Sequence, residues 1–180
     1  YQFGGTPFFA NPQITPLYPF NILFLLVPLP TAFLCFVVLH IVLACAGMYF
    51  FLKQFVDEMS SFAGGILFGL SGFFVARIYS GHLGIIASAA WTPWIVGLWF
   101  LSIKKTMPSN YLFFASFCTA LQLMAGYQSV TIFTFEILGI AAVVYSIYKK
   151  SYIPFLSIFI IGISGIGLSA FQMLPILEFL

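Results

Sequence analysis

Long apolar runs alternate along the chain with short polar connections. A membrane-spanning helix needs about 20 apolar residues, because each residue adds roughly 1.5 Å along the helix axis. Six runs come close to this length, at residues 31–52, 60–79, 82–103, 110–125, 127–148 and 152–174. The pattern predicts an all-α, polytopic transmembrane helix bundle of about six spans.

The first 30 residues do not follow this pattern. Residues 1–20 are rich in Gly and Pro, which predicts an irregular loop. Residues 21–30 are apolar but too short to cross a membrane, and Pro28 and Pro30 interrupt them, so we expect an interfacial or re-entrant segment. The predicted organisation is a loop, this short segment and a bundle over residues 31–180. We expect the whole to be a fragment of a larger membrane module.

Composition supports a membrane protein. The chain is 62% hydrophobic and 6% charged, whereas about 25% of the residues in a soluble domain are charged. Its net charge of +2 comes from few, scattered residues, which excludes a basic surface for nucleic acid. Cys35, Cys45 and Cys118 lack the spacing of a zinc or redox motif, so we interpret them as small apolar residues.

The positive charges indicate an orientation. The lysines follow the first, third and fifth predicted spans, as Lys53, Lys104, Lys105, Lys149 and Lys150. Loops rich in Lys and Arg stay in the cytoplasm, so residues 4–13, 79–84 and 126–129 are expected to face outward. Arg77 lies on that outward side. We therefore predict a multi-pass protein of the cytoplasmic membrane with an extracytoplasmic N-terminal loop.

Small residues recur at helical spacing in two of the predicted spans. The first set, which we place on one helix face, is Gly65, Gly69, Gly72 and Ala76. The second set is Gly162, Gly165 and Ser169. Small residues let helix backbones approach closely in lipid, so both sets predict tight contacts between helices.

Arg77 and His82 are candidates for binding a lipid-linked phosphate. Arginine binds phosphate oxygens with two parallel hydrogen bonds, and the start of the next helix offers free backbone N–H groups. The alternative is that Arg77 extends towards lipid headgroups and His82 is an exposed turn residue. Both interpretations remain open at this point.

Three amide side chains are candidates for donor binding. Asn11 and Gln13 lie in the N-terminal loop and carry the paired donors and acceptors that recognise sugar hydroxyls. The alternative is a loop that satisfies only its own backbone. Gln128 lies two turns outward of Glu136 on nearly the same helix face, so the two predict a polar line that opens to the outer side.

Glu136 falls inside the fifth predicted span, where a carboxyl group is costly unless it is protonated or paired. His40 lies at a similar depth in the first full span and is the candidate partner. A buried Glu136–His40 hydrogen bond that locks two helices is one interpretation, and a catalytic role is the other.

Together these segments resemble the bacterial YfhO family of multispanning membrane proteins, which belongs with the GT-C class of polyprenyl-phosphate-sugar-dependent glycosyltransferases. The resemblance covers nearly the whole chain. It rests on residues 4–13, 18–21, 39–40, 46–49, 70–77, 81–83, 90–93, 121–128 and 172–175.

The resemblance implies sugar transfer from a polyprenyl-phosphate carrier in the lipid bilayer to an extracytoplasmic acceptor, such as a cell-envelope polymer. Enzymes of this class carry their catalytic acidic residue in the first outer loop. Residues 1–20 hold no Asp or Glu, so we expect that residue upstream of Tyr1. The sequence identifies no cofactor and leaves the need for a divalent metal open.

Two other functions remain as alternatives: a transporter or flippase of a lipid-linked sugar, and a non-catalytic subunit of a membrane assembly. A transporter needs polar residues that reach both membrane faces. The line from Gln128 to Glu136 opens only outward, which favours the one-sided pocket of an enzyme.

Overall fold

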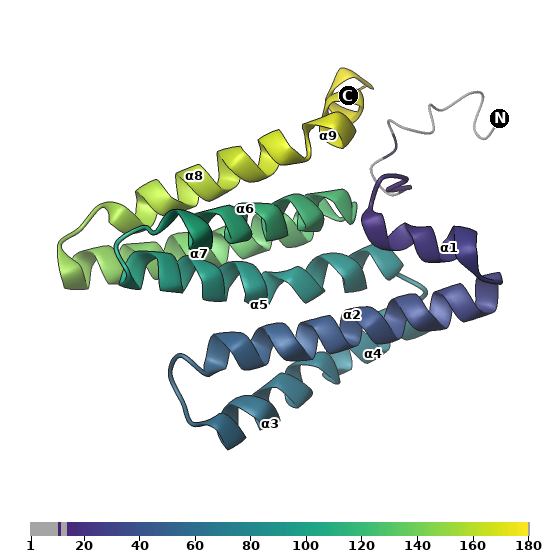
Figure 1. Cartoon of the computed structure of the whole chain (residues 1–180), viewed down its shortest axis with the longest axis horizontal. Coiled ribbons are helices and arrows are strands. Elements are labelled where there is room, and N and C mark those ends of the chain that lie inside the picture. The colour runs from purple at the N-terminus through teal and green to yellow at the C-terminus, as the bar shows by residue number, and fades with distance from the viewer. Residues whose placement is uncertain (1–10, 12–13, 180) are drawn as a thin grey trace.

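In this computed structural model, which describes residue 11 and residues 14–179, the chain is helical and those residues contain no strand (Figure 1). The helices in chain order are η1 (Pro19–Ile22), α1 (Leu23–Leu26), α2 (Leu29–Leu52), α3 (Glu58–Gly69), α4 (Gly72–Tyr79), α5 (Leu83–Lys104), α6 (Ser109–Met124), α7 (Gln128–Lys149), α8 (Ile153–Leu168) and α9 (Ala170–Phe179). The predicted all-α class is confirmed.

Within the described residues, four helical segments are long and apolar enough to cross a membrane: α2, the pair α3 and α4, α5 and α7. The pair α8 and α9 makes a fifth if it counts as one span, although it bends by 78°. Helix α6 has 16 residues and is therefore about 24 Å long, shorter than a hydrocarbon core of about 30 Å. A membrane-type bundle is confirmed with four or five candidate spans.

The helices run alternately in opposite directions, so their connections gather at two ends (Figure 1). We call one the lysine end, because it holds the connections after α2, α5 and α7. Its lysines are Lys53, Lys104, Lys105, Lys149 and Lys150. The other, the mouth end, holds the start of α2 and the connections from α4 to α5 and from α6 to α7. Arg77 lies there, at the end of α4.

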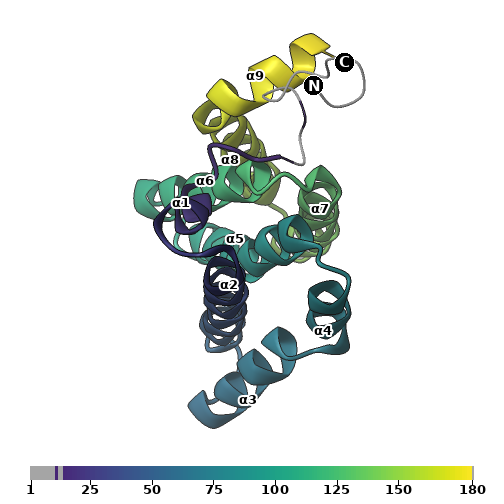
Figure 2. The ribbon, with the colours of Figure 1, turned by 90° about the vertical axis from the view of Figure 1, so that its right-hand side faces the viewer.

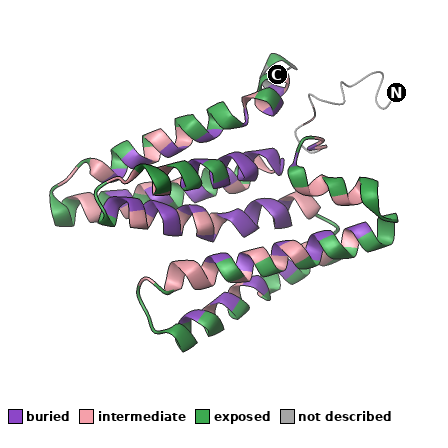
Figure 3. Ribbon diagram, viewed as in Figure 1, coloured by how far each residue is buried: buried purple, intermediate pink, exposed green. Residues whose placement is uncertain are grey.

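Helix α5 is the centre of the bundle and packs against α2, α6 and α7 (Figure 2). Its residues are buried around most of the helix circumference, whereas α3, α7 and α8 expose wide faces (Figure 3). A helix that is apolar on all sides is typical of the interior of a bundle. The core includes Trp91, Ile95 and Trp99 of α5, and the helix continues through Pro93.

The second predicted span is not one straight helix, because α3 ends at Gly69 and α4 begins at Gly72. Gly65 and Gly69 lie against Cys45 of α2, so a side chain at either position would collide with it. A side chain at Gly72 would meet nothing within 4 Å. The predicted single face of small residues is thus confirmed for Gly65 and Gly69 and wrong for Gly72, since the break redirects the helix.

The small residues of α8 meet two different neighbours. A Cβ atom added to Gly165 would lie 2.7 Å from Thr119 of α6, and one added to Gly162 would lie 3.2 Å from Phe135 of α7. The predicted close approach is therefore present. Gly165 and Gly162 let α8 pack closely against α6 and α7.

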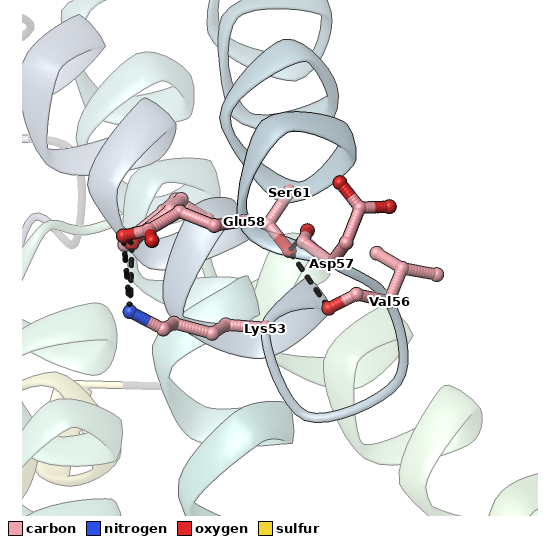
Figure 4. Close-up of polar contacts among 6 residues, drawn as sticks. Lys53, Val56, Asp57, Glu58 and Ser61 are labelled. Carbon is pink, nitrogen blue, oxygen red and sulfur yellow. Dashed lines mark hydrogen bonds and ion pairs between the residues drawn. The ribbon is translucent and has the colours of Figure 1, made fainter.

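Local hydrogen bonds order the turn from α2 to α3 at the lysine end (Figure 4). Asp57 caps α3, because its carboxylate accepts from the backbone N–H and the hydroxyl of Ser60 at 3.0 and 2.7 Å. Lys53 Nζ lies 3.3 Å from Glu58 Oε1, and the Tyr49 hydroxyl donates to the same oxygen at 2.9 Å. The turn is thereby closed by its own side chains.

The N-terminal region has helical turns where the sequence predicted an interfacial segment at residues 21–30. η1 and α1 cover residues 19–26, and α2 begins at Leu29 with Pro30 in its first turn. Proline is favoured there because the first helical N–H groups have no partner in the helix. Most of the predicted loop at residues 1–20, including Gln13, lies outside the described residues.

Candidate functional site

Two glycine turns shape the mouth end. Gly81 joins α4 to α5 with φ of 70°, and Gly126 joins α6 to α7 with φ of 86°. Glycine adopts this left-handed conformation without a Cβ clash. The turns place the first residues of α5 and α7 at the same end as the last residues of α4 and α6, so positive and negative helix-dipole ends meet there. The N–H of Leu83 bonds to the Gly81 carbonyl oxygen and that of Val130 to the Tyr127 carbonyl oxygen. The positive charge at the mouth end comes from the side chain of Arg77.

Arg77 and His82 lie together at this end. Arg77 Nη1 is 3.4 Å from His82 Nδ1, and because a guanidinium only donates, the imidazole nitrogen accepts. The guanidinium also lies 5.6 Å from the centre of the Phe73 ring. Among the described residues, Arg77 forms no ion pair with a carboxylate. The predicted proximity of Arg77 and His82 is confirmed, while their role stays a prediction.

His82 borders a hollow of about 380 Å³ between the two glycine turns. The lining of this hollow, which we call the turn hollow, comes from residues 81–85 and 125–127, and His82 is its basic side chain. Gly81 is exposed, whereas Gly126 is buried and a Cβ atom at Gly84 would lie 3.1 Å from the Ala125 carbonyl oxygen, so glycine here lets the two turns pack closely.

A second hollow of about 690 Å³ adjoins the first, because Leu83, Gly84 and Ala125 line both. Its other lining residues come from the segment 14–25 and from Phe36, and most of them are apolar. The mouth end thus offers the turn hollow, which His82 lines beside Arg77, and an adjoining hollow that is largely apolar.

A buried hydrogen-bond chain holds the N-terminal segment against the bundle. Trp91 Nε1 donates to the Tyr18 hydroxyl at 3.0 Å, and this hydroxyl lies 2.7 Å from His40 Nε2. His40 Nδ1 lies 2.7 Å from the carbonyl oxygen of Phe36. A carbonyl only accepts, so Nδ1 carries the proton and Nε2 accepts from Tyr18. Burial raises the pKa of the Tyr18 hydroxyl, which therefore remains a donor.

These hydrogen bonds correct one expectation. His40 does not pair with Glu136, because Tyr18 and Phe36 occupy both ring nitrogens. Tyr18 is 2% exposed and lies inside the bundle. A lone histidine in an apolar helix signals a buried partner. The sequence could not identify Tyr18, because the partner comes from a preceding loop.

Gln122 is the centre of a second buried polar cluster. Its amide nitrogen lies 3.0 Å from the Ser88 carbonyl oxygen, the Thr92 hydroxyl and the Thr134 hydroxyl. The two threonine hydroxyls are 3.0 Å apart. The cluster links α5, α6 and α7 through groups that bond to one another. It replaces the predicted polar line from Gln128 to Glu136 as the polar part of the interior.

The remaining candidates lie apart from that cluster. Gln128, the first residue of α7, is half-buried, and its amide nitrogen is buried without a hydrogen-bond partner among the described residues. Asn11 is half-buried, and its backbone oxygen accepts from Ile14 at 3.2 Å. Glu136 is exposed on the outward face of α7. Of these three, Gln128 is the one close in sequence to the Gly126 turn that lines the turn hollow.

The acidic residues do not gather at the mouth end. Of the four in the chain, Asp57 and Glu58 lie at the lysine end, Glu136 lies along α7, and Glu178 is exposed on α9. No group of three or more His, Cys, Asp or Glu residues that could hold a metal ion occurs in the described part of the chain. Arg77 and His82 are basic side chains of the mouth end, and α9, which carries Glu178, packs at that end through the hydrogen bond from Gln172 to the Met124 carbonyl oxygen.

Comparisons with family models, with curated proteins and with solved structures find no match to this chain.

Proposed function

We propose that the chain is part of an integral membrane glycosyltransferase, and that its mouth end binds the phosphate of a polyprenyl-phosphate sugar donor. The observation that supports this most is the adjoining pair of hollows. His82, which accepts from Arg77, lines the turn hollow, and the adjoining hollow is largely apolar. A lipid-linked phosphate has an anionic headgroup that suits Arg77 and His82 and an apolar chain that suits the second hollow.

The geometry around Arg77 suits a phosphate. The guanidinium has no carboxylate partner among the described residues and can place two N–H groups on two phosphate oxygens. The N-termini of α5 and α7 offer backbone N–H groups near the turn hollow, next to the carbonyl ends of α4 and α6, so the Arg77 side chain is the main attraction for a phosphate. His82, which accepts from Arg77 here, would turn its other nitrogen towards the sugar phosphate.

In this proposal the lysine end faces the cytoplasm, because Lys and Arg concentrate in cytoplasmic loops. The mouth end then faces outward, towards a cell-envelope polymer as acceptor. The chain crosses the membrane six times, with α6 as a short span and α8 with α9 as a bent one. The hydrogen bonds among Gln122, Thr92 and Thr134 favour a one-sided site over a transport path, since they hold these polar groups together in the interior, although the Gln122 carbonyl oxygen has no partner among the described residues.

We assign donor binding to the mouth end, and no proton transfer. A base that activates the acceptor hydroxyl must lie within hydrogen-bond reach of it. Asp57 and Glu58 are at the opposite end of the bundle, so they do not fit this role. Gln128, Asn11 and Gln13 remain candidates for contacts with the sugar.

The test is sugar transfer from the lipid carrier by the full-length protein in membranes. Arg77→Ala should lower transfer roughly 10- to 100-fold, because a charge-assisted contact contributes about 1.5–3 kcal/mol. Arg77→Lys should recover only part of this loss, since it keeps the charge but not the planar fork. His82→Ala should lower transfer less than Arg77→Ala.

Lys105→Ala is the matched control, because it removes a positive charge at the lysine end. It should leave transfer unchanged. Wild-type transfer by Arg77→Ala, Arg77→Lys and His82→Ala would reject the proposed phosphate site. It would favour a simple contact of Arg77 with lipid headgroups.

A further inference from the structure

Helix α7 carries an isolated carboxyl group on its outward face. Glu136 is exposed, and it has no hydrogen-bond or ion-pair partner among the described residues. Its neighbours on this face are apolar, including Ile132, Ile137 and Ile140, which is 68% exposed. A carboxyl group within a membrane span is costly unless it is protonated or paired. Glu136 therefore favours a neutral form and a hydrogen-bonding group next to this face.

The same face of α7 carries the residue spacing that is typical of two paired helices. Ile132, Glu136, Gly139 and Val143 follow one another at spacings of four, three and four residues, the seven-residue repeat of two helices that wind around each other. A side chain at Gly139 would meet nothing within 4 Å, so the backbone there is open to a close neighbour. Small residues beside a polar group are typical of helix contacts in lipid.

We propose that α7 pairs with α7 of a second copy of this chain, with the two Glu136 side chains opposite each other. Two copies in one membrane have the same orientation, so a two-fold axis along the membrane normal sets identical residues against each other. A neutral carboxyl group has one O–H donor and one carbonyl acceptor, so an identical group satisfies both. The Glu136 side chains of two copies can therefore hydrogen-bond to each other.

Glu136 also borders a groove of about 560 Å³ between α6, α7 and α8, which an amphiphile could occupy instead. Thr131 lines this groove, and its buried hydroxyl has no partner within the described residues. However, the α7 residues that line the groove end at Glu136. The repeat continues to Gly139 and Val143, which favours a second helix as the partner of this face.

The test measures self-association of the full-length protein in phosphatidylethanolamine–phosphatidylglycerol vesicles by counting photobleaching steps of a single fluorophore per chain. The wild type should bleach in two steps. Glu136→Leu should weaken the dimer about tenfold, as expected for loss of a polar contact in lipid, and Glu136→Gln should retain it because an amide also pairs with itself. Gly139→Leu should abolish the dimer while leaving the helical circular dichroism unchanged.

Gly167→Leu is the control for Gly139→Leu, because that α8 position is equally open and lies away from the repeat. In a background without Cys35, Cys45 and Cys118, Val143→Cys should form a disulfide-linked dimer on oxidation, and Val144→Cys should not. A monomeric wild type, or equal dimers for wild type, Glu136→Leu and Gly139→Leu, would overturn the proposal. If the wild type is monomeric and binds a lipid, and Thr131→Val no longer binds that lipid, the groove would be assigned to an amphiphile.

Discussion

The two ends of the bundle hold positive charge in different ways. At the lysine end, Lys53 contacts Tyr49 and Glu58, and Lys105 donates to the Tyr111 hydroxyl at 2.8 Å. At the mouth end, Arg77 contacts only His82 and a phenylalanine ring among the described residues, and His82 lines a hollow. Local side chains thus satisfy Lys53 and Lys105 at the lysine end, although Lys104 and Lys150 have no such contact in the described part of the chain. At the mouth end, Arg77 has no carboxylate or hydroxyl partner among the described residues.

The interior between the two ends holds two buried sets of polar residues. In the first, hydrogen bonds join Trp91 to Tyr18 and Tyr18 to His40. In the second, the Gln122 amide nitrogen bonds to its neighbours, but the Gln122 carbonyl oxygen is buried without a partner among the described residues. A missing hydrogen-bond partner alone therefore does not identify a binding residue, and the hollow beside His82 is the added observation at the mouth end.

The largest expected effect on stability concerns the packing contact between α2 and α3. Gly69→Leu should prevent folding or destabilise the protein by about 3 kcal/mol or more, because the new side chain would overlap Cys45 and approach the Ile41 carbonyl oxygen. The yield of folded protein and its thermal midpoint in detergent measure this. Gly72→Leu is the control, since no atom lies within 4 Å of that site. Equal losses for both variants would refute the contact.

The next effect compares a glutamine of the interior with one near the mouth end. Gln122→Leu should lower the free energy of unfolding by about 2 kcal/mol, because buried acceptors lose their donor. Gln128→Leu should leave stability almost unchanged, since its amide nitrogen has no partner in the described residues. Chemical denaturation in mixed micelles separates the two. A larger loss of unfolding free energy for Gln128→Leu than for Gln122→Leu would contradict the assignment of Gln122 to the hydrogen-bonded interior and of Gln128 to an unpaired position.

A smaller effect compares two tyrosines, one at each end. Tyr18→Phe removes the hydroxyl that joins Trp91 to His40, so it should cost about 1–2 kcal/mol of stability. Tyr111→Phe removes only an exposed bond to Lys105 and should cost less than about 0.5 kcal/mol. Thermal unfolding of both variants provides the measurement. Equal stability of Tyr18→Phe and the wild type would show that the buried chain does not hold the N-terminal segment.

The smallest effect is a pH dependence at the lysine end. Hydrogen bonds from the Ser60 hydroxyl and backbone N–H lower the pKa of Asp57. A lowered folded-state pKa gives stability that is present above the unfolded value of about 4 and lost as the pH falls through the folded value. The thermal midpoint should therefore drop below about pH 4, and less so in Asp57→Ala. If the thermal midpoints of the wild type and Asp57→Ala change in parallel with pH, Asp57 does not contribute to the pH dependence of stability.

The sequence predicted the helical class, the grouping of the lysines and the proximity of Arg77 to His82. These follow from local rules, because apolar run length sets helices and a turn of a few residues keeps its two flanks together. The break between Gly69 and Gly72 was missed, since small residues indicate close packing but not the direction in which a helix continues.

The partners of the buried polar residues could not be predicted. His40 was matched to Glu136 by depth alone, yet its true partner Tyr18 precedes α2. Likewise Gln122 bonds to Thr92 and Thr134, which lie on two other helices. Such pairings depend on how helices rotate about their axes, and spacing along one chain does not specify this rotation.

The most direct test of the mouth site is binding of undecaprenyl phosphate to the full-length protein in lipid nanodiscs, measured as a dissociation constant. The account predicts binding by the wild type and by Lys105→Ala, and a loss of roughly 10- to 100-fold for Arg77→Ala. Added inorganic phosphate should compete only weakly, because it lacks the apolar chain. Equal affinity of the wild type and Arg77→Ala, or an equal loss in Lys105→Ala, would contradict a phosphate site at the mouth end.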